Sequence, residues 1–210
     1  MTAKANNNLI MRRVDLDNSE KDLDSLIQAA KSERAAFARL YRIHYDSIFR
    51  LCSRRLFNRH AAEDVTSTVF FKVMRNIGSF EGNTNEFRNW LYRIAINAIN
   101  DQLRTTRRRA DAIKIATQEH GRWVSARSES DLQEINLTLK QAILALKPKY
   151  QTVITLRFFE KMKLIEIAEV LDQNPATIRS QLSRALNRLR KELEAVGCLG
   201  TVSIEDERQQ

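Results

Sequence analysis

Hydrophobic residues recur at three- and four-residue intervals along most of the chain, which is the spacing of one face of an α-helix. The pattern begins at Leu23. A first stripe contains Phe37, Leu40, Tyr41, Ile48, Leu51 and Cys52, and a second contains Val65, Val69, Val73 and Ile77. Residues 79–85 include Gly82-Asn83 and predict a loop, followed by a long helix from Phe87 to about Arg104. These segments predict a helical domain over residues 23–108.

A second group of periodic segments predicts a smaller helical domain over residues 132–194. Its apolar positions are Leu132, Ile135, Leu139 and Ile143, then 153–159, 167–171 and 178–189. Pro148 suits the opening turn of a helix. Residues 109–131 continue from an arginine run and are diluted by Gly and Ser, so they predict a flexible basic linker that could hold a short helix but not a third core. Residues 1–22 and 195–210 lack a clear period and predict tails.

One turn joins two of these helices within four residues. Asp172-Gln173-Asn174 interrupts the apolar pattern, and Pro175 suits the first turn of a new helix. Asp172 tolerates the left-handed backbone that such a reversal needs. Asn174 or the Thr177 hydroxyl can accept hydrogen bonds from the new helix's first amides. This pattern is typical of a helix-turn-helix, whose second helix enters a DNA major groove.

The second helix of this motif has an apolar face and a polar face. Stepped at about 100° per residue, its inward side is Ile178, Leu182, Ala185, Leu186 and Leu189. The candidate DNA contacts on the other side are Thr177, Arg179, Ser180, Gln181, Arg184 and Arg188. Arg can pair with guanine, Gln with adenine and Ser with either. No acidic residue occurs from Asn174 through Lys191 to repel phosphate. An amphipathic hairpin with a solvated polar face is the alternative.

The helix predicted after residue 86 reserves a narrow stripe for polar and aromatic residues. The stripe consists of Trp90, Arg93, Asn97, Asn100, Asp101 and Arg104, and it leads into Arg107-Arg108-Arg109. An aromatic ring beside amides and guanidiniums suits unstacked bases and their phosphates. Asp101 weakens this interpretation. The alternative is that Trp90 is a core residue beside a solvated strip.

Composition and charge narrow the classes of function. With only five Gly and two Pro, the chain favours an all-α fold over a turn-rich sheet protein. The excess of 35 Lys+Arg over 26 Asp+Glu favours a polyanionic partner, either nucleic acid or an anionic membrane surface. His44, His60 and His120 lie on separate segments without metal-ligand spacing. We therefore expect neither an enzyme nor a cofactor nor a metal site.

The chain shows no sign of export or membrane insertion. Cys52 and Cys198 lie far apart and neither forms a CxxC pair, and Cys52 falls on an apolar helical face. The apolar run at residues 9–11 is too short for a signal peptide, and no run approaches the length of a membrane span. The sequence predicts a soluble, cytoplasmic protein.

Taken together, the two halves resemble a bacterial RNA polymerase sigma factor of the small, extracytoplasmic-function (ECF) type. The first half is similar to region two of that family through AAFARLYRIHYDSIFRLC, AAEDVTSTVFFKVMR and FRNWLYRIAINAINDQLR. The second half is similar to region four through LKPKYQTVITLRFFEKMKLIEIAEVLDQNPATIRSQLSRALNRLRKEL. The resemblance covers about 23–108 and 132–193. The short linker leaves no room for the middle domain of larger sigma factors.

The resemblance implies a non-catalytic specificity subunit whose partners are core RNA polymerase, promoter DNA and an anti-sigma factor. Its second domain would read the minus-thirty-five element as duplex, through Arg179, Ser180, Gln181 and Arg184. Its first domain would capture extruded bases of the minus-ten element. The residues that correspond there are Phe80, Asn83, Asn85, Trp90 and Asn97, with Arg93 and Arg104 on phosphates.

The resemblance also implies that the helix over 62–75 docks on the polymerase clamp. Its candidate contacts are Glu63, Asp64, Ser67 and Phe71. The chain departs from the family at Ser67-Thr68, in a longer loop after Phe80, and at Asp172 and Gln173 in the turn. The alternative function is a helix-turn-helix regulator that acts without being a polymerase subunit. Such a regulator leaves the Trp90 stripe and the basic linker unexplained.

Overall fold

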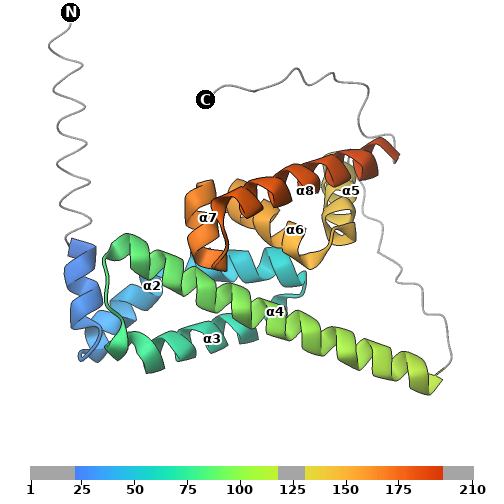
Figure 1. Cartoon of the computed structure of the whole chain (residues 1–210). Helices are drawn as coiled ribbons and strands as arrows, with labels where there is room; N and C mark the ends of the chain where they lie inside the picture. Colours follow the sequence, from blue (N-terminus) through green and yellow to red (C-terminus); the bar gives the residue numbers. More distant parts are fainter. Residues whose placement is uncertain (1–21, 118–130, 196–210) are drawn as a thin grey trace, which may run out of the picture. The chain divides into compact units, whose positions relative to one another are not determined.

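The computed structural model describes residues 22–117 and 131–195 (Figure 1). The chain divides into two compact units, Met1–Asp111 and Ala112–Gln210. All regular structure within the described ranges is helical, which confirms the all-α class. Nearly all of the two expected tails and the later part of the expected linker lie outside the described residues.

The first unit begins with a short helix over residues 22–29. It continues with α2 (Arg34–Leu56), α3 (Arg59–Asn76), a 3₁₀ turn η1 (Ile77–Ser79) and α4 (Thr84–Thr117). Phe57 caps the C-terminus of α2 and takes a left-handed φ of 51°. Asn58 then caps α3, because its Oδ1 accepts the N–H of Ala61 at 2.9 Å. This short connection lets α3 pack along α2.

The core of the first unit is built from the predicted apolar stripes. Its buried members are Leu40, Ile48, Leu51 and Cys52 of α2, Val65, Val69 and Val73 of α3, and Phe87, Leu91, Ala95 and Ile99 of α4. Tyr41 departs from its stripe, since it is 36% exposed and its ring lies beside Phe70 at 4.6 Å. The interpretation of Cys52 as a core residue is confirmed, and burial raises the pKa of its thiol to about 11.

α4 is longer than the apolar pattern predicted. It begins at Thr84 rather than Phe87 and continues through Thr117, past Arg104, where the predicted helix ends. The extension contains neither Gly nor Pro and is rich in Arg and Ala, which are strong helix formers. The first part of the expected linker is therefore helical. Arg107, Arg108 and Arg109 lie exposed on its surface.

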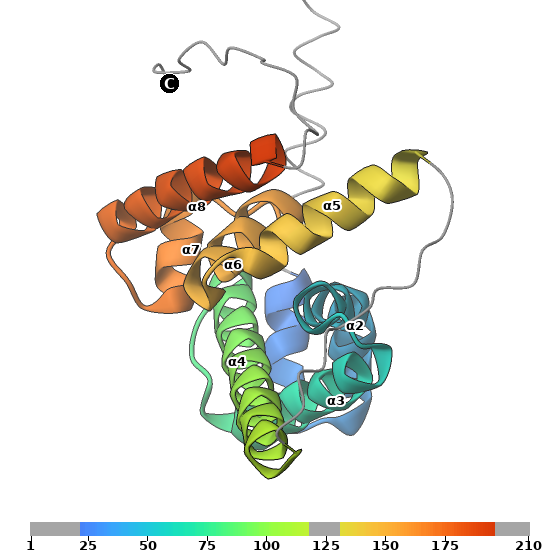
Figure 2. The ribbon, with the colours of Figure 1, turned by 90° about the vertical axis from the view of Figure 1, so that its right-hand side faces the viewer.

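The second unit contains α5 (Asp131–Ala145), α6 (Pro148–Ile154), a π-helical segment η2 (Thr155–Phe159), α7 (Leu164–Leu171) and α8 (Pro175–Ala195). α8 lies against α5, α6 and α7 (Figure 2). One core cluster joins Leu146, Tyr150, Ile154 and Ala185, with Leu182 and Leu189 packed against it. The inward assignment of Leu186 is wrong, because its side chain is 39% exposed.

The apolar run at residues 153–159 does not continue as a uniform α-helix. The chain passes into the π-helical segment at Thr155, and Phe158 and Phe159 are 53% and 40% exposed. Lys161 takes a left-handed φ of 56°, and Arg157 Nη1 donates to the carbonyl of Met162 at 3.1 Å. This arrangement redirects the chain toward α7 and buries Met162 completely.

Candidate DNA and polymerase interfaces

The turn before α8 is fixed by local hydrogen bonds. Asp172 takes φ 53° and ψ 51°, so the predicted left-handed residue is confirmed. The N–H of Gln173 donates to the carbonyl of Ala168 at 2.9 Å, which closes α7. Asn174 Oδ1 accepts the N–H of Ala176 at 2.8 Å, and Pro175 is the first residue of α8. The second helix of the helix-turn-helix therefore begins at a defined residue, Pro175.

The polar face of α8 is open to solvent. Thr177, Arg179, Ser180, Arg184 and Arg188 are all exposed. Among the described residues, Arg179 and Arg184 make no ion pair, so both guanidiniums are available to a ligand. The guanidinium of Arg188 instead lies 5.4 Å from the centre of the Tyr150 ring. The structure thus groups five of the six predicted duplex contacts on one accessible surface.

Gln181, the sixth predicted duplex contact, has a different environment. Its side chain is only partly exposed, and its Nε2 donates to Oε1 of Gln173 at 2.7 Å. Its own Oε1 is buried and has no hydrogen-bond partner. The amide of Gln181 is therefore turned back toward the turn.

The loop before α4 packs on an aromatic cluster. Phe80 is buried, with its ring 5.2 Å from Trp90 and 5.5 Å from Phe87. Trp90 is half-buried, and it also lies 5.7 Å from Phe87. Trp90 is therefore partly a core residue, as the alternative held, and partly accessible. In this conformation the Phe80 ring packs against Trp90 and supports it, and Phe80 is not itself available to DNA.

The N-terminus of α4 is closed by three acceptor side chains. Asn83 Oδ1 accepts the N–H groups of Asn85 and Glu86 at 2.9 and 3.0 Å, and Glu86 Oε2 accepts the N–H of Asn83 at 2.8 Å. Asp24 Oδ1, from the first helix, accepts both the N–H and the hydroxyl of Thr84 at 2.6 Å. These donors are therefore all satisfied within the protein. The Asn-x-x-Glu spacing could have revealed the reciprocal cap, but nothing local points to Asp24.

Gly82 shapes the same loop. Its φ of 146° is one that other residues rarely adopt, and a Cβ there would lie 2.7 Å from Glu86 Oε2 and 3.1 Å from Phe80 Cζ. The loop can therefore close over Phe80 and the cap only with glycine at this position.

The polar stripe of α4 is present as predicted. Arg93, Asn97 and Arg104 are exposed, and Asn85 is exposed in the first turn. Arg104 Nη2 pairs with Asp101 Oδ1 at 2.9 Å, and both side chains are more than half exposed, so the guanidinium remains accessible. The stripe thus offers an indole face, an amide and cationic groups along one side of a helix.

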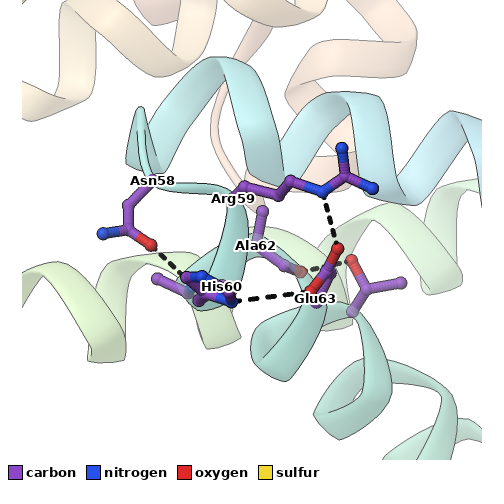
Figure 3. A network of polar contacts seen from close by, with 7 residues as sticks. Asn58, Arg59, His60, Ala62 and Glu63 are labelled. Atoms are coloured by element: carbon purple, nitrogen blue, oxygen red, sulfur yellow. Dashed lines mark hydrogen bonds and ion pairs between the residues drawn. The ribbon is translucent and has the colours of Figure 1, made fainter.

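The predicted docking residues share the outer face of α3. At its start, Arg59 Nε lies 2.9 Å from Glu63 Oε1, and His60 Nδ1 lies 3.9 Å from Glu63 Oε2 (Figure 3). Asp64 and Ser67 are exposed, and Phe71 is 54% exposed. Spacings of three and four residues place these side chains along one strip. The strip is acidic near its N-terminal end and apolar at the other.

An apolar continuation extends this strip. Met74 is 52% exposed and borders a cavity of 460 Å³. The cavity is lined by Ala30, Lys31, Ser32, Glu33, Arg34, Phe37, Met74 and Ile77. Nothing in the apolar pattern marks Met74 as a surface residue, because an apolar residue next to Val73 cannot be told from a core position by sequence.

No helix in the described ranges is long and apolar enough to span a bilayer. Within the same ranges, no three His, Cys, Asp or Glu side chains are grouped so that they could hold a metal ion.

Comparison with known proteins identifies the class. The family model described as Sigma-70 region 2 matches residues 40–109, and the model described as Sigma-70, region 4 matches residues 136–189. These matches fall on the two helical units in order and define a sigma factor of RNA polymerase. The ECF RNA polymerase sigma factor SigW of Bacillus subtilis is 35% identical over 175 residues, which cover 79% of this chain and 93% of SigW. The chain belongs to the ECF sigma factors.

Other relatives agree with this assignment. The ECF sigma factor BldN of Streptomyces coelicolor is 29% identical over 180 residues, covering 85% of this chain and 68% of BldN. The fold is similar to that of CnrH, solved with the cytosolic domain of CnrY, with a TM-score of 0.60, 20% identity and coverage of 82% of this chain and 97% of the other. RpoE of Bartonella quintana, solved with the anti-sigma factor NepR, is also similar, with a TM-score of 0.57 and 22% identity. The match covers 75% of this chain and 96% of the RpoE chain. The alternative of a regulator outside the polymerase is not favoured.

Proposed function

We propose that this chain binds core RNA polymerase in the cytoplasm, directs it to specific promoters and assists strand opening, without catalysis of its own. The observation that carries the proposal is the helix-turn-helix. Its second helix starts at a fixed residue and presents an exposed basic face in a chain of the ECF family. An anti-sigma factor is the regulatory partner that we propose, since the sigma factor RpoE, which has a similar fold, was solved with the anti-sigma factor NepR.

In this proposal α8 reads the minus-thirty-five element as duplex. Arg179 and Arg184 carry forked donors that match guanine edges or phosphates. Ser180 lies beside them as a short donor and acceptor, while Thr177 and Arg188 lie at the margins. The absence of acidic residues from this stretch keeps phosphate attraction intact.

The first unit, in the same proposal, holds the unpaired minus-ten strand. Trp90 offers a ring face for stacking, and Asn97 offers an amide to base edges. Arg93 and Arg104 lie on the same side of α4, where they can contact phosphates. Asn83 contributes as the cap of α4, and Phe80 contributes as the support of Trp90. Asn85, exposed in the first turn, remains a candidate for direct contact.

The strip on α3 is the surface that we propose for core polymerase. Phe71 and Met74 supply exposed apolar area near one end, and Glu63 and Asp64 supply carboxylates near the other. An apolar anchor with a charged margin is a common arrangement at protein interfaces.

In vitro transcription with bacterial core polymerase tests the proposal. The protein alone should bind promoter duplex weakly, and addition of core polymerase should give transcripts with defined start sites. If no genomic template yields a start-site-specific transcript, the proposed function is wrong.

Two variants separate the two DNA-reading roles. Trp90→Ala should reduce permanganate reactivity of minus-ten thymines while polymerase recruitment is retained, because the stacking face is lost. Arg184→Ala should alter minus-thirty-five preference, by about 1–3 kcal/mol for a lost bidentate base contact. Arg190→Ala is the matched control for the second variant, since Arg190 is paired with Glu194 at 2.7 Å. Equal loss of activity in both variants through unfolding would contradict these roles.

A further inference from the structure

We propose that Gln173 is a positioning residue that sets base preference by holding the amide of Gln181 away from the major groove. This inference rests on the proposed reading of duplex DNA by α8. Gln173 lies in the turn, eight positions before Gln181, and does not belong to the DNA-reading face itself.

The contact between the two glutamines uses the atoms that base reading requires. Gln181 Nε2 donates to Gln173 Oε1 at 2.7 Å, and Gln181 Oε1 is buried without a partner. A glutamine reads adenine through both amide atoms at once, with its oxygen on N6 and its nitrogen on N7. While the contact lasts, one of these atoms is engaged and the other is enclosed. Gln181 cannot read adenine in this state.

The direction of the side chain follows from its place on α8. Side chains in a helix lean toward the N-terminus, so Gln181 leans toward the turn that contains Gln173. Arg179, Ser180 and Arg184 are exposed, and no contact in the described residues holds them back in this way. In the wild-type protein, base reading is therefore left to these three residues.

The energetic balance makes the arrangement sensitive to Gln173. An enclosed amide oxygen without a hydrogen bond is unfavourable, so burial alone does not explain why Gln181 stays folded back. The hydrogen bond to Gln173 is the polar contact that favours this position. Removing the acceptor should release the amide toward the groove, where a base can satisfy both of its atoms.

Gln173→Leu is the decisive variant. It removes the acceptor from an exposed side chain and leaves intact the main-chain bond from residue 173 to the carbonyl of Ala168. Holoenzyme formed with each variant would select from a duplex promoter pool in which the minus-thirty-five element is randomised. Gln173→Leu should gain a preference for adenine of at least about five-fold at one position, as expected for a new bidentate pair. The double variant Gln173→Leu/Gln181→Ala should lose this preference, and Gln181→Ala alone should select as the wild type does.

Gln173→Glu is the matched control. It keeps an acceptor oxygen at the same place and should retain the wild-type base preference, with lower affinity because it adds a negative charge near phosphate. A purely structural role of Gln173 would shift the thermal midpoint and weaken all sequences equally.

Two results would overturn the inference and leave the proposed function standing. One is a Gln173→Leu holoenzyme that selects the same sequences as the wild type. The other is that Gln181→Ala changes the base preference of the wild type as strongly as it changes the base preference of Gln173→Leu. A wild-type holoenzyme that selects no minus-thirty-five sequence would overturn both the inference and the proposed function.

Discussion

His44 on α2 is a titratable side chain inside the first unit. Its ring lies 5.6 Å from that of Phe87, and its Nε2 has no hydrogen-bond partner. Burial, and then the nearby charge of Arg88, lowers the pKa of His44 from 6.5 to about 4. The imidazole is therefore neutral in the folded protein at neutral pH and behaves as part of the packing between α2 and α4.

Acidification should destabilise the first unit through His44. Because the pKa is lower in the folded state, the unfolded chain binds the proton first as the pH falls. The free energy of unfolding should thus decrease between pH 6.5 and about 4, by about 1–3 kcal/mol. Denaturant unfolding of His44→Gln should show a flatter pH dependence in this window.

A second histidine provides the control for this measurement. His60 is on the surface, with a side chain that is 92% exposed. His60→Gln should keep the wild-type pH dependence. An unchanged slope in His44→Gln would contradict the role assigned to His44.

The element that depends most visibly on a distant residue is α4. Asp24 lies 60 positions before Thr84 and accepts two hydrogen bonds at the start of that helix. Asp24→Ala should lower the free energy of unfolding by about 1–2 kcal/mol, which is the usual cost of losing a cap. It should also impair promoter opening, because the loop of residues 80–83 is anchored at the same point.

Chemical denaturation and permanganate footprinting check this prediction. Asp22→Ala is the matched control, since Asp22 is exposed on the same short helix. Asp24→Asn keeps an acceptor oxygen and should recover part of the loss. Equal effects of Asp22→Ala and Asp24→Ala would show that the carboxylate of Asp24 acts only through its charge.

Turn chemistry made the helix-turn-helix predictable from the sequence. Asp172, Asn174 and Pro175 each act on backbone groups within a few positions, so their neighbours in sequence decide their roles. The role of Asn58 is equally local, because it lies between two apolar stripes and caps α3 through an amide three residues away. The apolar faces of α2, α3 and α4 were predictable for the same reason, because burial imposes the helical period on the sequence.

Contacts that depend on packing were not predictable. The family resemblance implied that Phe80 contacts DNA, but its position is decided by packing against Phe87 and Trp90. The extension of α4 to Thr117 was not predicted, because apolar periodicity reports burial and the extension opens with exposed polar residues over 105–109. The contact from Gln181 to Gln173 likewise depends on the orientation of two side chains.

At the scale of the whole molecule, the proposed function puts binding to polymerase and reading of duplex on different units. Phe71 is on α3 of the first unit, while Arg179 and Arg184 are on α8 of the second. Phe71→Ala should weaken binding to core polymerase by about ten-fold, which corresponds to about 1.4 kcal/mol. Binding of the free protein to promoter duplex should not change, since α8 is untouched.

A fluorescence titration of labelled protein with core polymerase measures this effect. Ile43→Ala provides the control, because Ile43 is a similarly exposed apolar residue, at 51%, on α2. The thermal midpoint should remain unchanged in both variants. If Ile43→Ala weakens polymerase binding as much as Phe71→Ala does, the docking surface is not confined to α3.

In the role proposed for the first unit, the closed N-terminus of α4 also decides how a melted strand can run past it. Free first-turn amides commonly attract phosphate, but here the Asp24 carboxylate already engages the amide of Thr84, and Asn83 Oδ1 engages those of Asn85 and Glu86. The carboxylate of Glu86 lies at the same tip, on the amide of Asn83. A sugar–phosphate chain gains no attraction at this tip and is repelled by the two acids. Nucleobases, which carry no charge, are what this end of the helix can accept. The strand's anionic side is then turned toward the arginine flank at Arg93 and Arg104.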